Sequence, residues 1–264
     1  MSRIGYKENK NINWIRIILI VVFCTLLMVS AYKIIEWGKD NKANDEILDN
    51  IYEAIEVYEE ATNTVENVDN NKNTNDYKVD FDKLKKQNKD TVAWLKVNNT
   101  EINYPVVQAK DNSYYINHNF NKKYNQAGWV FVDYKNKLDG TDKNIVIYGH
   151  NMKNNSMFGS LPDVLSKKWY NNKDNYIIDF VIEEKEYKYQ VFSIYKIETE
   201  DYYITTEFES DEFSQFIKII KGRSYKNFKV DITNEDTILT LSTCGSTNNY
   251  RIVLHAKLIK EHND

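Results

Sequence analysis

Proline and glycine are scarce in this chain, whose 264 residues include only two prolines and eight glycines. Tyrosine and phenylalanine are abundant, with 20 and 11 copies. This balance is typical of a β-rich core with few tight turns. The length allows one sizeable domain or two small ones.

The chain also lacks a strong charge of one sign. Its formal net charge is −4 and no long basic run appears, so binding to nucleic acid has no electrostatic support. The acidic residues are dispersed, and a metal site needs clustered ligands. We therefore expect no metal, calcium included, and no other cofactor.

The two cysteines are too few for a disulfide framework. Cys24 lies in an apolar segment with helical character, and Cys244 lies far along the chain at the end of an expected strand. Oxidising compartments favour paired thiols. An unpaired thiol in an exported domain is therefore better explained by chemistry than by structure.

The N-terminal part contains a candidate membrane anchor. Residues 17–32 carry no charge, and the segment 14–36 reaches the ~20 residues that a bilayer span requires. Trp14 and Trp37 fall where interfacial aromatics belong, and positive residues dominate the preceding segment, 1–13. We expect a single-pass protein of the cell membrane, in contact with lipid, with a cytoplasmic tail at 1–13 and an extracellular remainder.

A cleaved signal peptide is the alternative, with Val29-Ser-Ala31 as its cleavage site. The apolar run is longer than the central region of an ordinary signal peptide, which favours a retained anchor. In both cases the rest of the chain is exported.

Residues 37–76 are expected to be an extracellular linker, followed by a catalytic domain at 77–264. Within the linker, 45–60 has apolar residues at helical spacing and reads as an amphipathic helix. This helix either packs on the domain or holds the domain away from the membrane. The segment 62–75 is rich in Asn and Thr and reads as a flexible spacer.

Short runs of β-branched and apolar residues recur along 77–264 and predict strands. The expected strands are 92–97, 101–108, 129–133, 145–148, 176–182, 185–197, 236–243 and 251–259. Short helices are expected at 81–88, 157–165 and 207–221, with a helical turn at 112–117. Pro105 makes 101–108 an edge or irregular strand. The even spacing favours a mostly antiparallel closed β-barrel over a parallel α/β sheet.

Three reactive side chains stand where these strands begin or end. Cys244 ends one strand, the turn 245–249 follows, and Arg251 opens the next strand. His150 comes directly after Gly149 at the end of another strand. A thiolate can attack a carbonyl while a guanidinium stabilises the resulting oxyanion. A lone Cys or His is often only structural, but together the three predict acyl transfer.

The sequence around these residues resembles the sortase signature, and that of class B most closely. The matching stretches lie between about Trp94 and Leu258: Asn103-Tyr-Pro-Val-Val-Gln, Asp111-Asn-Ser-Tyr-Tyr, Ile147-Tyr-Gly-His-Asn-Met, Ser156-Met-Phe and Leu241-Ser-Thr-Cys. The histidine precedes the cysteine, whereas in papain-like enzymes the nucleophile comes first.

Sortases are membrane-anchored cysteine transpeptidases of Gram-positive bacteria. The resemblance implies a closed sortase-type barrel of about eight strands, with peripheral helices that include 207–221. It also implies that Cys244 cleaves a C-terminal sorting signal after threonine through a thioester. The partners would be exported proteins that carry the signal and an amine of a cell-wall precursor or peptidoglycan.

The resemblance further implies a substrate groove lined by Tyr148, Ser242, Tyr203 and Ile204. Each has a structural alternative, since Tyr148 and Ser242 can be ordinary strand residues and Tyr203 a core residue. The loop from Cys244 to Arg251 is shorter than in some relatives and has Gly245 directly after the nucleophile, which leaves its substrate contacts open.

Several alternatives stay open. Asp133 and Asp163 are candidates for orienting His150, although both also read as surface acids. His255 reads as structural, and His118 and His262 have no supporting context. The same Cys–His–Arg site would also serve a hydrolase, and a catalytically silent, membrane-tethered binding barrel is a third function class.

Overall fold

The computed structural model describes residues 14–62, 79–183, 185–209, 211–244 and 249–263. The chain divides into two compact units, Met1–Lys42 and Ala43–Asp264. The predicted cytoplasmic tail and most of the predicted spacer lie outside the described residues.

The predicted membrane span lies in α1, Trp14–Thr62. Within it, Trp14–Tyr52 includes an 18-residue stretch with a mean hydropathy of 2.5, and that stretch is long and apolar enough to cross a membrane. The amphipathic segment that we expected as a separate helix belongs to the same helix α1. The helix continues through residues 37–44 although they include Gly38, Asp40 and Asn41, which favour turns; no proline interrupts it.

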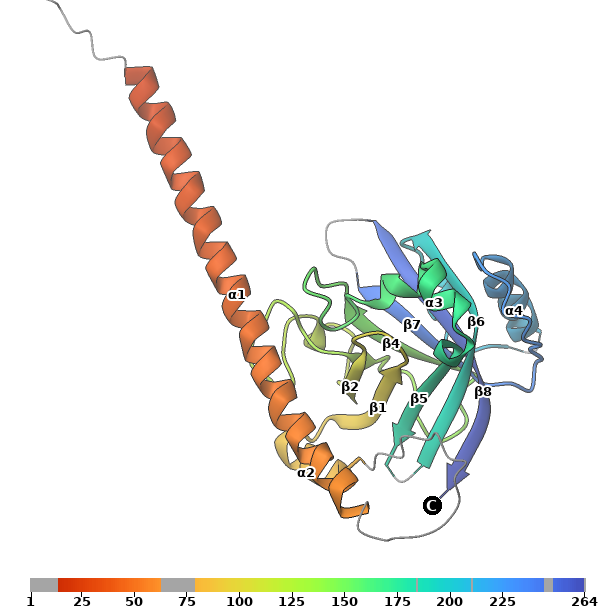
Figure 1. The fold of residues 1–264 in the computed structure, drawn as a ribbon. Coiled ribbons are helices and arrows are strands. Elements are labelled where there is room, and N and C mark those ends of the chain that lie inside the picture. The colour runs from red at the N-terminus through yellow and green to blue at the C-terminus, as the bar shows by residue number, and fades with distance from the viewer. Residues whose placement is uncertain (1–13, 63–78, 184, 210, 245–248, 264) are drawn as a thin grey trace, which may run out of the picture. The chain divides into compact units, whose positions relative to one another are not determined.

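The second unit is built around a closed barrel, as predicted (Figure 1). Its strand order is β1-β2-β3-β4-β7-β8-β6-β5. The strands are β1 (Thr91–Val97), β2 (Asn103–Val107), β3 (Phe131–Val132), β4 (Asn144–His150), β5 (Ile177–Ile182), β6 (Lys185–Glu198), β7 (Ile238–Cys244) and β8 (Tyr250–Asn263). Two neighbouring pairs are parallel, β2 with β3 and β4 with β7, and the others are antiparallel.

Pro105 lies within β2, whose pairing with β3 is the shortest strand pairing of the barrel. It is paired with Trp94 of β1, whereas β2 meets β3 through the single pair Val107–Phe131. Proline has no amide hydrogen to give to a ladder, so a strand that contains it tolerates only a short seam on one side.

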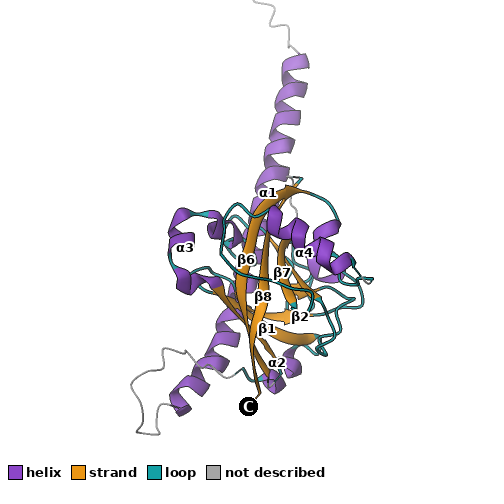
Figure 2. Ribbon diagram, turned by 90° about the vertical axis from the view of Figure 1, so that its right-hand side faces the viewer, coloured by secondary structure: helices purple, strands orange, loops and turns teal. Residues whose placement is uncertain are grey.

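Short helices cover the barrel (Figure 2). They are α2 (Phe81–Gln87), η1 (Tyr114–Ile116), η2 (Leu161–Leu165), α3 (Lys167–Asn171), η3 (Lys173–Tyr176), η4 (Tyr202–Ile204) and α4 (Glu212–Gly222). The helix predicted over 207–221 is α4, which begins five residues later and buries Phe213, Phe216, Ile217 and Ile220.

The helix predicted over 157–165 is wrong in its first part. Only Leu161–Leu165 is helical, as η2. Asn155 and Met157 have positive φ angles of 65° and 54°, which a right-handed helix does not allow. The preceding segment instead folds into turns, with a bridge between Asn151 and Met157.

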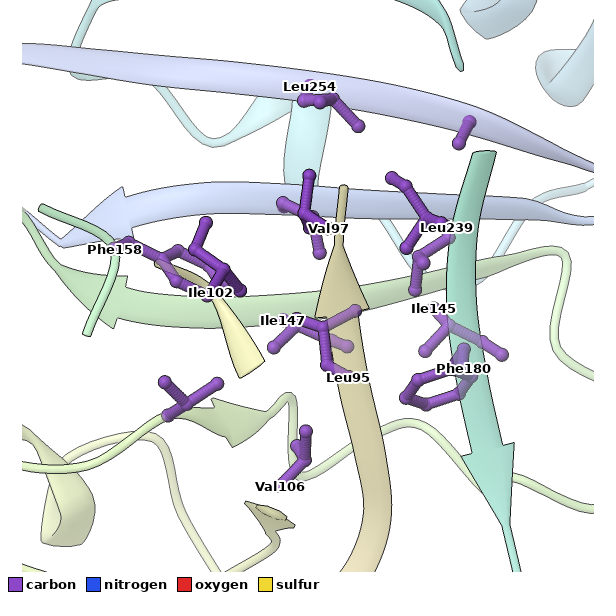
Figure 3. Packing of buried hydrophobic residues seen from close by; sticks show 14 of the residues in the cluster. Leu95, Val97, Ile102, Val106, Ile145, Ile147, Phe158, Phe180, Leu239 and Leu254 are labelled. Carbon is purple, nitrogen blue, oxygen red and sulfur yellow. The ribbon is translucent and has the colours of Figure 1, made fainter. Parts of the chain in front are cut away.

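Apolar side chains from all around the wall fill the barrel (Figure 3). The labelled residues are Leu95, Val97, Ile102, Val106, Ile145, Ile147, Phe158, Phe180, Leu239 and Leu254, all buried. Burial of each such side chain stabilises the fold by about 1.5–3 kcal/mol. This rigid core is what holds the strand ends that carry the candidate site.

The part of α1 that belongs to the second unit packs on the barrel. Ile47, Leu48 and Ile51 are buried in the main core cluster. The Tyr52 hydroxyl donates a hydrogen bond to the Asn103 carbonyl. Of the two alternatives for the amphipathic segment, the structure therefore shows that its described part packs on the domain. The compact unit accordingly begins at Ala43.

Candidate active site

The candidate nucleophile and the candidate base end two neighbouring strands. β4 and β7 run in parallel and in register from the pair Asn144–Ile238 to the pair His150–Cys244. Residues in register on adjacent strands share one face of a sheet. The backbone therefore brings these two predicted positions side by side at one end of the barrel wall.

The position of Arg251 follows from the pairing of β7 with β8, on the side of β7 away from β4. β7 and β8 are antiparallel and in register up to the pair Ser242–Val253, and the Ile252 amide donates to Thr243 Oγ1 at 2.9 Å. Continued by two residues, this register sets Arg251 opposite Cys244. Arg251 itself is half-buried. The predicted loop contacts lie outside the described residues, which omit 245–248.

His150 is half-buried and its ring is held by a backbone group. Its Nε2 lies 2.7 Å from the carbonyl oxygen of Ile116. Since a carbonyl only accepts, Nε2 donates this hydrogen bond. Burial lowers the pKa of His150 below its ordinary value, and the hydrogen bond to Ile116 opposes part of that shift. A lowered pKa favours the neutral imidazole that can take up a proton.

The backbone of His150 is fixed as well. Its carbonyl accepts hydrogen bonds from the amides of Met152, at 3.0 Å, and Phe158, at 2.9 Å. The Phe158 ring also covers Gly149, where an added Cβ would lie 2.6 Å from ring atom Cγ. Only glycine permits so close an approach, so the ring and Gly149 together hold the end of β4.

Asp133 is a buried acid, which corrects the expectation of a surface residue. Its Oδ2 accepts from the Tyr148 hydroxyl and from Asn112 Nδ2, each at 2.8 Å. Its Oδ1 accepts from the Lys135 amide at 2.9 Å. These bonds tie Asp133 to the wall of the barrel and leave the Ile116 carbonyl as the partner of His150.

Asp163, the other carboxylate considered for orienting His150, is exposed in η2. Sequence reasoning did not find the Ile116 carbonyl, because a main-chain acceptor is present at every residue and has no side-chain signature. A sequence signal near it is the stretch Asp111-Asn-Ser-Tyr-Tyr, which resembles the sortase signature and ends directly before Ile116.

The structure brings three of the four predicted substrate-binding residues together, and the fourth, Ile204, follows Tyr203 in the chain. Tyr148 and Ser242 are in register on β4 and β7, and the Ser242 hydroxyl lies 3.2 Å from that of Tyr203 in η4. Tyr148, Ser242 and Tyr203 are buried, whereas Ile204 is half-buried. Their contact with substrate stays a prediction, and their burial gives each a packing role as well.

The other described histidines have partners of their own. His255 is fully buried and lies within hydrogen-bond distance of Tyr195 and Thr240, which agrees with the structural role expected for it. His118 bonds the Tyr114 carbonyl through Nδ1, and the side chain of His262 lies outside what the structure describes. Among the described residues, no three His, Cys, Asp or Glu side chains are grouped as metal ligands would be.

The chain is similar in sequence to known proteins over almost its whole length. The family model of the sortase domain matches residues 95–259. Sortase B of Staphylococcus aureus (strain NCTC 8325 / PS 47) is 35% identical over 247 residues, which cover 91% of this chain and 95% of that protein. Sortase B of Listeria monocytogenes serovar 1/2a is 36% identical over 245 residues, with the same two coverages, 91% and 95%.

Solved structures of sortase B resemble this chain as well. A Staphylococcus aureus sortase B–substrate complex has a TM-score of 0.64 and 41% identity, over 68% of this chain and 84% of that one. Sortase B of Bacillus anthracis has a TM-score of 0.64 and 35% identity, over 79% and 97%. The barrel, the strand-end positions of cysteine, histidine and arginine, and these similarities lead to one conclusion: the chain belongs to class B of the sortase family of cysteine transpeptidases.

Proposed function

We propose that this transpeptidase cleaves a C-terminal sorting signal after threonine and transfers the exported protein to a cell-wall amine. The observation that carries the proposal is the register of β4, β7 and β8, which lines up the positions of His150, Cys244 and Arg251. The Staphylococcus aureus relative was solved as a substrate complex, which supports a substrate-binding role for this fold.

In the first half-reaction, the Cys244 thiolate attacks the carbonyl carbon of the threonine. A C–S bond forms, and Arg251 stabilises the oxyanion through charge-assisted hydrogen bonds, which are roughly twice as strong as neutral ones. The oxyanion then collapses and the C–N bond breaks. His150 gives its proton to the departing amine, and a thioester remains.

In the second half-reaction, an amine of the cell wall or of its precursor attacks the thioester. His150 takes the proton that this amine loses, a new C–N bond forms and the C–S bond breaks. The thiolate and the protonated histidine are then restored. One thioester thus divides a difficult amide exchange into two easier acyl transfers.

We further propose that α1 anchors the enzyme in the membrane as a single-pass span, with the barrel on the outer side. The apolar stretch within Trp14–Tyr52 supports this. An anchored enzyme would meet its exported substrates where they leave the membrane.

The thioester gives the decisive experiment. Purified enzyme is mixed with a pooled peptide library and hydroxylamine, and the products are identified by mass spectrometry. We expect peptide hydroxamates cleaved after threonine, a rate that rises with hydroxylamine, and parallel double-reciprocal plots. Free acid as the main product at high hydroxylamine, without a gain in rate, would instead identify a hydrolase.

A further inference from the structure

The two ring nitrogens of His150 have different surroundings. Nε2 lies 2.7 Å from the Ile116 carbonyl oxygen, and Nδ1 has no hydrogen bond to any residue that the structure describes. We propose that the Ile116 carbonyl is the group that orients His150, and that Nδ1 is the nitrogen that gives and takes the catalytic proton. This inference rests on the proposed function, in which His150 is the acid and base.

The proton count follows from that geometry. Nε2 keeps its hydrogen throughout, because the carbonyl it faces can only accept. In the neutral ring Nδ1 is therefore a bare acceptor, ready for the proton of the incoming amine. In the protonated ring Nδ1–H is the donor to the departing amine. A carbonyl fixes the tautomer in the way that a second group fixes the histidine of other acid–base sites.

The Ile116 carbonyl is itself rigidly placed. Ile116 ends η1, and the peptide groups on both sides of it are tied down. The Tyr115 carbonyl accepts from the Trp129 amide at 2.9 Å, and the Asn117 carbonyl accepts from the Asn125 amide at 2.9 Å. The acceptor of His150 is thus held from both directions along the chain.

Gly128 packs directly against this carbonyl. Its φ is +58°, and a Cβ added there would lie 2.6 Å from the Ile116 oxygen and 2.4 Å from the Tyr115 oxygen. Both distances are far below ordinary contact, so only glycine allows the two backbones to meet in this way. Asn44 of α1 secures the same segment, since it accepts from Asn125 Nδ2 at 3.0 Å and donates to the Gly128 carbonyl at 3.4 Å.

A carbonyl and a carboxylate would have different effects on the histidine. A carboxylate orients the ring and also raises the pKa strongly through its charge. A carbonyl orients the ring without a net charge. The strand register sets Cys244 on β7 beside His150 and Arg251 one strand further, on β8. His118 follows Ile116 by two residues and bonds the Tyr114 carbonyl, while Asp133 is bonded to Tyr148, Asn112 and Lys135.

Two variants of the full chain test the proposal. Gly128→Ala pushes the new methyl group into the Ile116 and Tyr115 oxygens and so displaces the acceptor. Gly140→Ala is the matched control, because Gly140 also has a positive φ, +90°, but its Cβ would meet nothing within 4 Å. Both variants carry the strain of an alanine at positive φ, and only Gly128→Ala moves the carbonyl.

The readouts are ¹⁵N NMR of ring-labelled histidine across pH, and kcat and KM for transpeptidation. In the wild type we expect hydrogen on Nε2 and a bare Nδ1 when His150 is neutral. In Gly128→Ala we expect a mixture of tautomers, a lower pKa of His150 because the Ile116 hydrogen bond raises it, and a kcat that is lower by roughly ten- to a hundredfold with KM little changed. Gly140→Ala should match the wild type in all of these.

A second perturbation covers the case in which Gly128→Ala does not fold. Replacement of Asn117 by its α-hydroxy acid analogue turns the Ile116 carbonyl into an ester, which is a poorer acceptor, and leaves every side chain in place. It also removes the Asn117 amide, whose hydrogen bond to the Tyr114 carbonyl is long, at 3.4 Å. It should lower the pKa of His150 and kcat in the same direction as Gly128→Ala.

Hydrogen on Nδ1 in the neutral wild-type ring would overturn the proposal, as would an unchanged titration and kcat in the ester variant. Because NMR reads the tautomer without turnover, the two proposals can fail separately. If the ring has the expected tautomer but His150→Asn retains transpeptidation, the acid–base role is refuted while the orientation by Ile116 stands.

Discussion

Tyr195 and His255 share a hydrogen bond of 2.7 Å within the barrel wall. The other ring nitrogen, Nδ1, lies 2.8 Å from Thr240 Oγ1, and that hydroxyl donates to Asn144 Oδ1 at 2.6 Å. Since the threonine hydroxyl has one hydrogen, Nδ1 donates to it. Burial lowers the pKa of His255 well below its ordinary value, so Nε2 has no hydrogen and accepts from Tyr195. The buried, neutral ring thus belongs to a network that connects β6, β8, β7 and β4.

This network predicts a pH dependence of stability. Burial lowers the pKa of His255 from 6.5 to about 3 in the folded chain. Between these values the unfolded chain binds a proton that the folded chain does not, so the free energy of unfolding falls as the pH drops below 6.5. One such group contributes a slope of about 1.4 kcal/mol per pH unit.

Urea unfolding of wild type and His255→Phe at several pH values checks this. The variant should be less stable overall, since Tyr195 and Thr240 lose a buried partner, but its stability should fall less steeply with acid. The readout is the slope of the free energy of unfolding against pH, because this slope does not depend on how much stability the variant loses at neutral pH. Equal slopes in the two proteins would show that His255 is not the titrating group.

Cys244→Ala should abolish turnover and leave the fold intact. Without a thiol no acyl-enzyme can form. Peptide cleavage and thioester trapping with hydroxylamine measure the loss of turnover. The thermal melting temperature shows whether the fold is intact. Substantial cleavage by a well-folded variant would refute the role of Cys244.

Arg251→Lys should lower kcat/KM by roughly a hundredfold or more, as the loss of an oxyanion donor does. Lysine keeps the positive charge but lacks the planar, multi-donor guanidinium. Arg223→Lys, an identical exchange at the end of α4, is the control and should keep activity. If Arg251→Lys came within a few-fold of wild type, Arg251 would act only as a diffuse charge.

Ile51→Ala should lower the free energy of unfolding by about 2–5 kcal/mol, as for other buried isoleucines. Ile51 is 1% exposed where α1 packs on the barrel. Asp49→Ala, on the exposed side of the same helix, is the matched control and should change stability by no more than about 0.5 kcal/mol. Equal effects of the two substitutions would mean that the helix adds nothing to the fold.

Protease added to intact protoplasts tests the proposed orientation. With the N-terminus inside, the protease should reach the second unit and release barrel fragments, while a tag placed before residue 14 stays protected. A protected barrel in intact protoplasts, digested only after lysis, would place the catalytic unit on the inner side.

The strands could be predicted because each depends on a short local pattern. The β-branched run before Cys244 and the apolar run before Gly149 predict strands without knowledge of their neighbours. The pairing of β4 with β7, however, is a relation between distant segments. It was inferred from the chemistry of Cys and His and from the resemblance, and not from either strand alone.

The features that the sequence did not reveal are also relations between segments. Asp133 is buried because Tyr148 and Asn112 reach it from elsewhere in the chain, whereas an aspartate at the end of the strand expected over 129–133 suggests a surface acid. The Ile116 carbonyl has no signature of its own. Whether the amphipathic part of α1 packs or stands free depends on a complementary surface that includes Trp94, whose ring lies 6.2 Å from that of Tyr52.

The parallel pairing of β4 with β7 also determines when this enzyme becomes reactive during folding. Parallel strands cannot be joined by a tight turn, and here the connection between them contains β5, β6 and α4. Such a long-range contact forms late, because the entropy of closing the loop must be overcome first. A newly made chain therefore has its thiol and its imidazole before they lie side by side, and we expect the proposed acyl transfer by Cys244 to begin only when the barrel closes.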